Sequence, residues 1–103
     1  MTRPEKEKGT KVLTPGKYLT ATKTENFRKR LIKAVGQSEE GGVVLDFTRV
    51  EAVDSAGLGL IIAAHNTLAN YGRKLTLTNV SKEIYGLFLA TRLDQQFEVI
   101  SVE

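Results

Sequence analysis

Val43-Val44-Leu45-Asp46-Phe47 is the stretch that decides the fold. Nearly continuous apolar, mostly branched side chains are typical of a strand buried on both faces, and such strands belong to parallel sheets. A short polar connection follows, and then Val53-Asp54-Ser55-Ala56-Gly57-Leu58-Gly59, where small and polar residues lead into a helical pattern. The sequence therefore predicts a strand followed by a helix, with Ser55 at their junction.

Alternating strand and helix patterns continue on the amino-terminal side of this unit. Residues 11–14 predict a short strand that Pro15-Gly16 ends, and residues 17–19 continue in an extended conformation. Residues 22–25, Thr-Lys-Thr-Glu, have the spacing of a capping box, which opens a helix that we expect to end at Gly36. The apolar face of this helix consists of Phe27, Leu31, Ile32 and Val35.

The same alternation continues on the carboxyl-terminal side. Apolar residues recur at helical intervals from Leu58 to Tyr71, after which Gly72 provides a stop. Residues 75–78 alternate as a half-buried strand, Ser81 is placed to cap a third helix, and residues 97–102 predict a last strand. The apolar positions are Leu58, Ile61, Ile62, Leu68 and Ala69 in the second helix, and Ile84, Leu87, Phe88 and Leu93 in the third. Because alternating strands and helices imply right-handed crossovers, we predict a small α/β domain with a mostly parallel central sheet and helices packed against it.

Size and composition indicate one intracellular domain. A chain of 103 residues suits a single core, and the absence of cysteine excludes disulfides and thiolate metal sites and fits the reducing cytoplasm. No apolar run approaches the roughly 20 residues that span a bilayer, and the N-terminus lacks the apolar segment of a signal peptide. We expect residues 1–10 to be a flexible tail and residues 11–103 to form the domain.

The positive charge is concentrated in the first third of the chain. Residues 1–33 hold ten Lys or Arg against three Glu, whereas residues 34–103 hold five against nine acidic residues. Arg28, Lys29, Arg30 and Lys33 are interrupted by apolar residues at helical spacing, which is typical of the solvated face of an amphipathic helix. The alternative is a patch for an acidic partner; no nucleic-acid motif accompanies these residues, so we expect no direct binding of nucleic acid.

The residues that carry most enzyme chemistry are missing or too far apart. His65 is the single histidine, and ten helical residues place it roughly 15 Å from Ser55, beyond hydrogen-bond reach. It has no second histidine or cysteine to complete a zinc site. Gly57 and Gly59 lack the remaining residues of a phosphate loop or a dinucleotide site, and nothing fixes Asp46 near Asp54 as an acid–base pair. We therefore predict a protein that is not an enzyme and that uses neither a metal nor a cofactor.

Two interpretations of Ser55 follow from its position. Its hydroxyl is placed to cap the first turn of the helix, and capping alone explains a serine there. Alternatively, phosphorylation would add about −1.5 to −2 charges at neutral pH beside Asp54, on a surface that small residues leave open to an approaching protein. Residues alone do not separate a cap from a phosphorylation switch.

A family resemblance favours the switch. Residues 43–80 closely resemble a STAS domain of the anti-sigma-factor antagonist type, because Val44-Leu45-Asp46-Phe47-Thr48-Arg49-Val50 and Val53-Asp54-Ser55-Ala56-Gly57-Leu58-Gly59 are similar to its central strand and phosphorylatable-serine loop. Residues 75–81 resemble its next strand and turn, and the likeness extends over most of residues 11–100. The chain departs from the family pattern at three places. Leu19 stands where an acidic residue is usual, and residues 1–9 suit the family's first strand poorly. The end of the chain leaves little room for the final helix of many members.

The resemblance implies a bacterial regulator that switches partners. Without phosphate such a protein binds an anti-sigma factor that is also a GHKL-type serine kinase, and phosphorylation by that kinase releases it. Carried over to this chain, Ser55 is the phosphorylation site. The partner-binding residues are Asp54, Ser55, Ala56, Gly57, Leu58 and Gly59.

One alternative of another class remains open. STAS modules also serve as non-catalytic scaffolds or accessory subunits of transporters and signalling complexes, in which case Ser55 has no switching role. A kinase or anti-sigma-factor gene next to this one would favour the switch, and a transporter operon the alternative. A homodimer is compatible with either function.

Overall fold

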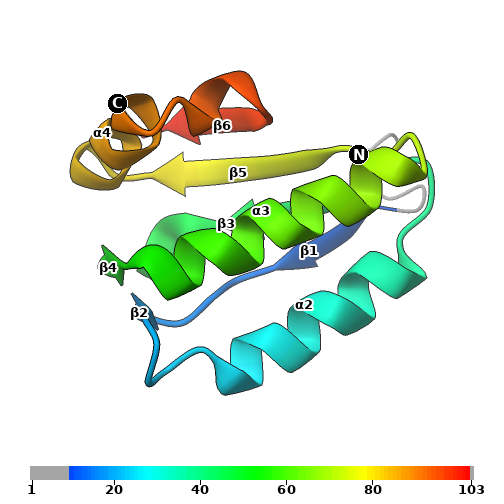
Figure 1. The fold of residues 1–103 in the computed structure, drawn as a ribbon, viewed down its shortest axis with the longest axis horizontal. Helices are drawn as coiled ribbons and strands as arrows, with labels where there is room; N and C mark the ends of the chain where they lie inside the picture. Colours follow the sequence, from blue (N-terminus) through cyan, green and yellow to red (C-terminus); the bar gives the residue numbers. More distant parts are fainter. Residues whose placement is uncertain (1–9, 103) are drawn as a thin grey trace, which may run out of the picture.

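The computed structural model describes residues 10–102, so the predicted tail lies, apart from Thr10, outside the described residues. Four parallel strands form the main sheet in the order β1-β3-β5-β6 (Figure 1). They are β1 Lys11–Leu13, β3 Val43–Asp46, β5 Leu75–Val80 and β6 Glu98–Ser101. The prediction of an α/β domain with a parallel central sheet is confirmed.

A second, very short sheet lies beyond the carboxyl ends of β1 and β3 (Figure 1). It pairs β2 Tyr18–Leu19 with β4 Ala52–Val53 in parallel. The sequence predicts the extended course of residues 17–19 but not their pairing with Ala52 and Val53, because two residues are too few to produce a periodic pattern.

Two helices cover one face of the main sheet side by side, α2 Glu25–Gln37 and α3 Ser55–Asn70 (Figure 1). The shorter α4 Lys82–Ala90 follows β5, and the 3-10 turns η1 Phe47–Arg49 and η2 Leu93–Gln95 precede β4 and β6. Ser81 caps α4 as predicted, because its hydroxyl accepts a hydrogen bond from the backbone N–H of Ile84 at 3.3 Å. Gly72 follows α3 with a φ of +70°, a conformation that favours glycine.

The core lies between the sheet and these helices. Val43 and Leu45 of β3 are fully buried, as are Leu75 and Leu77 of β5. Val44 and Asp46, which point to the other face of β3, are only half-buried. The prediction that β3 is buried on both faces is therefore wrong, since the covering helices α2 and α3 lie on one face only.

The structure also corrects the helical face of α2. Ile32 is 58% exposed, whereas Phe27, Leu31 and Ala34 are buried, so Ala34 takes the place that the sequence pattern assigned to Ile32. The capping box is also absent: the N-cap is Thr24 and its side chain makes no capping hydrogen bond. The helix α3 shows a similar shift, because Ile62 and Ala69 are exposed while Ile61, Ala64 and Leu68 are buried.

The strand β3 and the helix α4 both end earlier than their apolar patterns predict, because a 3-10 turn follows within the apolar run. Phe47 is buried but belongs to the turn η1 rather than to β3. Leu93 is buried but lies in η2, since Arg92 adopts a left-handed conformation with a φ of 63° after α4 ends. Burial alone does not distinguish these turns from the strand and helix that precede them.

Candidate functional site

Ser55 is the first residue of α3, at the edge of the molecule where the carboxyl ends of the parallel strands lie (Figure 1). Its side chain is exposed, and its hydroxyl forms no hydrogen bond with any residue of the described range 10–102. In open α/β sheets this edge is the usual place for binding sites, because the loops that follow the strands gather there.

Asp54, and not Ser55, caps α3. Its Oδ1 accepts hydrogen bonds from the backbone N–H groups of Ala56 at 2.9 Å and Gly57 at 3.1 Å. The interpretation of Ser55 as the helix cap is therefore wrong by one residue. An aspartate competes well for this position, because its carboxylate accepts two N–H groups and carries the charge that the helix N-terminus favours.

The second oxygen of Asp54 reaches a different segment. Oδ2 accepts a hydrogen bond from the backbone N–H of Ala21 at 3.1 Å, and the N–H of Asp54 donates to the carbonyl of Leu19 at 3.1 Å. One residue thus joins the start of α3 to the segment that follows β2. The sequence gives no sign of this link, because Ala21 contributes only its backbone.

Gly57 fixes how closely these two segments approach. A Cβ atom at this position would lie 2.2 Å from the carbonyl oxygen of Leu19, so only glycine fits without moving the backbone. Gly57 is buried, whereas Gly59 is exposed and borders open space. Among the predicted partner-binding residues Gly57 is therefore inside the protein, beneath the surface that Ser55 and Gly59 expose.

Hydrogen bonds hold the pKa of Asp54 below its usual value. The first cause is the bond from the Ala21 N–H, followed by the bond from Gly57, because both stabilise the ionised carboxylate. Asp54 therefore stays charged at neutral pH, and it directly precedes Ser55 in the chain.

Asp46 forms a separate polar cluster at the end of β3. Its Oδ1 accepts hydrogen bonds from the hydroxyl and the N–H of Thr48 and from Nδ2 of Asn79, at 2.9 Å for the last. These bonds, with the Thr48 hydroxyl first, lower the pKa of Asp46. Asp46 and Asp54 have different partners, so neither is arranged as the acid or base of a shared site.

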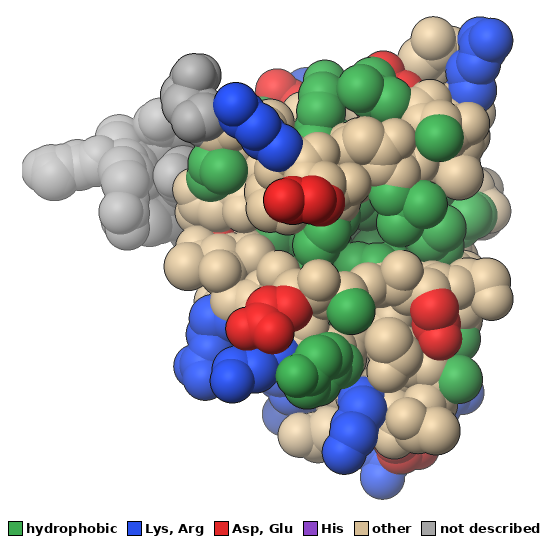
Figure 2. Space-filling model, turned by 90° about the vertical axis from the view of Figure 1, so that its left-hand side faces the viewer, with side chains coloured by type: hydrophobic (Ala, Val, Ile, Leu, Met, Phe, Trp, Pro, Cys, Tyr) green, Lys and Arg blue, Asp and Glu red, His purple; other side chains and the backbone are tan. Residues whose placement is uncertain are grey.

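Apart from Asp54, the surface that α3 contributes beside Ser55 carries no charged side chain. Residues 55–70 of α3 contain no Asp, Glu, Lys or Arg, and Gly59 and Ile62 follow Ser55 on its exposed side. Leu58 and Ala56 are half-buried beside them. Figure 2 faces this edge of the molecule and shows hydrophobic side chains gathered in the middle of the face, with acidic side chains separated around them.

The remaining candidate residues lie apart from this surface. His65 lies on α3, ten residues after Ser55, and its ring packs against Phe97 with 5.4 Å between centroids. The described residues hold no group of three or more His, Cys, Asp or Glu side chains that would bind a metal ion. Within residues 10–102, the helices are too short or too polar to cross a membrane.

The cationic residues Arg28, Lys29, Arg30 and Lys33 are all exposed on α2, as expected for a solvated face.

Comparison with known families gives one match that spans nearly the whole chain. Residues 2–103 match the model of the STAS domain family. Two curated relatives, the anti-sigma-B factor antagonists of Listeria monocytogenes and Listeria innocua, are each 36% identical to the chain over 70 residues. The aligned region covers 67% of this chain but 61% of those relatives, so it spans less than two thirds of their length.

Solved structures share the fold at lower identity. A candidate anti-sigma factor antagonist from Thermotoga maritima has a TM-score of 0.82 at 20% identity, covering 92% of this chain and 81% of its own. A sulfate transporter family protein from Wolinella succinogenes has a TM-score of 0.70 at 19% identity, covering 90% and 77%. The unphosphorylated anti-sigma factor antagonist SpoIIAA has a TM-score of 0.65 at 22% identity, covering 92% and 80%.

Proposed function

The chain belongs to the STAS domain family, and we propose that it is an anti-sigma factor antagonist controlled by phosphorylation of Ser55. In this proposal the unmodified protein binds an anti-sigma factor with GHKL-type serine kinase activity in the cytoplasm and so frees a sigma factor. The kinase transfers the γ-phosphoryl group of ATP to the Ser55 oxygen, and the modified protein is released. The protein itself catalyses no reaction.

The observation that carries this proposal is the division of roles between Asp54 and Ser55. Because Asp54 caps α3, the Ser55 hydroxyl is not needed for the fold and lies exposed at the start of the helix. A kinase needs an accessible hydroxyl on its substrate, and the exposed Ser55 provides one.

The same arrangement explains why a phosphate would end binding. The N–H groups of Ala56 and Gly57, which would otherwise stabilise an anion at the helix N-terminus, already bond to Asp54. A phosphate on Ser55 would face the ionised carboxylate of Asp54 instead. Its charge would be presented to the partner, where repulsion and desolvation oppose the contact.

The named relatives support this assignment. Both Listeria proteins are antagonists of an anti-sigma factor, and their similarity to this chain is detectable in the sequence itself. The uncharged outer side of α3 next to Ser55 fits a protein partner, since charged residues are depleted in the centre of protein interfaces.

A capture experiment followed by mass spectrometry tests the proposal. The immobilised protein should retain an anti-sigma factor kinase from a lysate of its own cells. The recombinant kinase with ATP should then add one phosphate, which intact-mass analysis detects in wild type and in Thr67→Ala but not in Ser55→Ala. Thr67 is the matched control, because it is another exposed hydroxyl residue on α3. Phosphate that persists in Ser55→Ala would refute the site.

The accessory-subunit alternative has one supporting observation, the fold shared with the Wolinella sulfate transporter family protein. It predicts that the immobilised protein retains transporter subunits and that Ser55 stays unmodified. It also predicts that a transporter gene, and no kinase gene, lies beside this one.

A further inference from the structure

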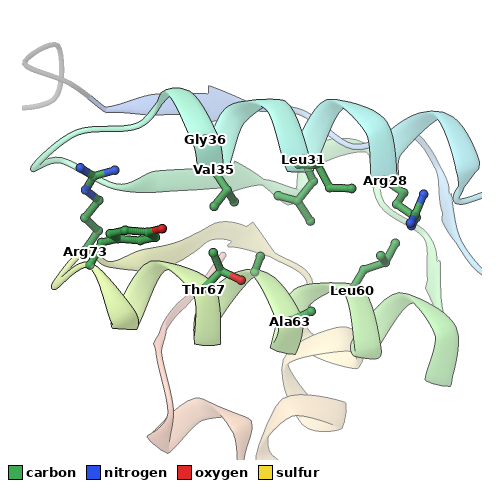
Figure 3. Close-up of a pocket in the computed structure, with 11 residues that line it drawn as sticks. Arg28, Leu31, Val35, Gly36, Leu60, Ala63, Thr67 and Arg73 are labelled. Atoms are coloured by element: carbon green, nitrogen blue, oxygen red, sulfur yellow. The ribbon is translucent and has the colours of Figure 1, made fainter.

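A groove of about 630 Å³ lies between α2 and α3, away from the exposed Ser55 hydroxyl. Its apolar lining comes from both helices, and Figure 3 shows Leu31 and Val35 of α2 facing Ala63 and Thr67 of α3 across it. The groove exists because small residues meet there: Gly36, Ala63 and Ala64 leave space that larger side chains would fill. Its volume is within the range of about 300 to 1,000 Å³ that is usual for small-molecule sites.

Two arginines and no acidic residue border this groove. Figure 3 shows Arg28 at one end and Arg73 at the other. Ile32 and Tyr71, also in the lining, are large hydrophobic side chains that are 58% and 68% exposed. A long apolar surface with cationic ends is complementary to an anionic molecule that has an apolar chain.

Arg73 is held in place more firmly than Arg28. Its Nη1 donates to the carbonyl oxygen of Ser38 at 2.7 Å, and its guanidinium lies 5.4 Å from the centre of the Tyr71 ring. Ser38 is itself buried, 3% exposed, so the guanidinium is anchored to the protein interior. These contacts leave its other N–H groups for a ligand, and a positioned guanidinium binds a carboxylate with two parallel hydrogen bonds.

From this geometry we propose that the groove binds an aliphatic carboxylate of the fatty-acid class. The carboxylate pairs with Arg73, and the chain lies between α2 and α3 on Leu31, Val35 and Leu60. A helix of a partner protein fits less well, because a helix is about 10–12 Å across with its side chains and α2 and α3 already lie side by side. The proposal is independent of Ser55 phosphorylation.

Titration with decanoate, followed by calorimetry and by amide NMR shifts, tests this site. We expect saturable binding with shifts confined to the facing sides of α2 and α3, and at least about tenfold weaker binding of decanol, which has the chain without the charge. Acetate, the charge without the chain, should not bind. Binding of decanol as tight as that of decanoate, or no saturable shift with decanoate, would overturn the proposal.

Two pairs of variants assign the binding to this groove. Ala63→Phe fills the groove and should abolish decanoate binding, whereas Ala69→Phe, on the same helix but outside the lining, should leave it unchanged. Arg73→Lys keeps the charge but loses the paired hydrogen bonds and should weaken binding about tenfold. Lys29→Gln, which removes an exposed charge on α2 outside the lining, should change binding less than about twofold. Circular dichroism confirms folding, and Thr67→Phe replaces Ala63→Phe if that variant does not fold.

The outcomes separate this proposal from the proposed function. Decanoate binding in Ser55→Ala equal to wild type, with loss in Ala63→Phe, supports the groove whatever the role of Ser55. If decanoate does not bind while Ala63→Phe prevents capture of the kinase, the groove is a protein interface and the proposal is wrong. Equal binding by Ala63→Phe and wild type would also contradict it.

Discussion

Asp54 and Ala21 are joined by a hydrogen bond of 3.1 Å between Oδ2 of the carboxylate and the backbone nitrogen, although 33 residues separate them in the chain. Because Oδ1 of the same carboxylate caps α3, this single side chain holds the loop that follows β2 against the helix that begins with Ser55. The position of the Ser55 hydroxyl therefore depends on Asp54 rather than on Ser55 itself.

Replacing the two neighbours should have unequal effects on stability. Asp54→Ala removes bonds to three backbone N–H groups, whereas Ser55→Ala removes an exposed hydroxyl with no partner among the described residues. We expect Ser55→Ala to change the free energy of unfolding by less than about 0.5 kcal/mol, and Asp54→Ala to lower it more. Urea denaturation measures both. An equal loss of unfolding free energy in the two variants would mean that Ser55 also caps α3.

Gly57 and Gly59 form a matched pair for testing the contact with β2. Alanine is a better helix former than glycine by about 1 kcal/mol, so Gly59→Ala, facing open space, should stabilise the protein by about 0.5–1 kcal/mol. Gly57→Ala instead places a Cβ atom against the carbonyl oxygen of Leu19 and should destabilise by about 1–3 kcal/mol. Thermal or urea unfolding gives the sign of each change, and a stabilising Gly57→Ala would contradict the close approach described for Leu19.

The core should depend on Leu45 far more than on the loop. Leu45 is fully buried in β3, and truncation of a buried leucine to alanine costs about 2–5 kcal/mol. Leu45→Ala should therefore lower the urea midpoint much more than Ser55→Ala does. Comparable losses of stability in the two variants would mean that the main role of Ser55 is to stabilise the fold.

Acid should weaken the contribution of Asp54 to stability. Hydrogen bonds lower the pKa of Asp54 in the folded protein, whereas the pKa of an aspartate in an unfolded chain is about 3.9. The unfolded state therefore takes up protons first, so this stabilisation is complete above the unfolded pKa and is lost as the pH falls through the folded pKa. The difference in unfolding free energy between wild type and Asp54→Ala should be constant from pH 7 to about 5 and shrink below about 4. A difference that grows on acidification would contradict the direction of the shift.

The sequence predicts most of the fold and the place of the candidate site, because both rest on local signals. Ser81 and Gly72 are recognisable from residue type at helix ends, and the strand Val43–Asp46 is recognisable from its apolar run. The sequence does not identify Asp54 as the cap of α3, because serine and aspartate are both good caps and adjacent residues compete for the position.

Other features depend on contacts between distant segments and leave no local pattern. Gly57 packs against the backbone and Cβ of Leu19, and the Asp54 side chain bonds to the backbone N–H of Ala21, so residue type at Leu19 and Ala21 does not reveal either contact. Ile32 looks like a core residue in the helical pattern, yet it borders the groove, because burial depends on how α2 lies against α3. Arg73 lies outside both helices, so helix periodicity does not connect it with Arg28.

The affinity of the protein for its anti-sigma factor kinase, with and without phosphoserine incorporated at position 55 during translation, tests the central claim most directly. Calorimetry with the purified kinase should give tight binding for the unmodified protein and at least about a hundredfold weaker binding for the phosphorylated one, with Ser55→Asp between them because it carries about one negative charge where phosphoserine carries −1.5 to −2. Circular dichroism should show the same fold in all three. If the phosphorylated protein, correctly folded, binds the kinase as tightly as the unmodified protein, Ser55 is not the switch.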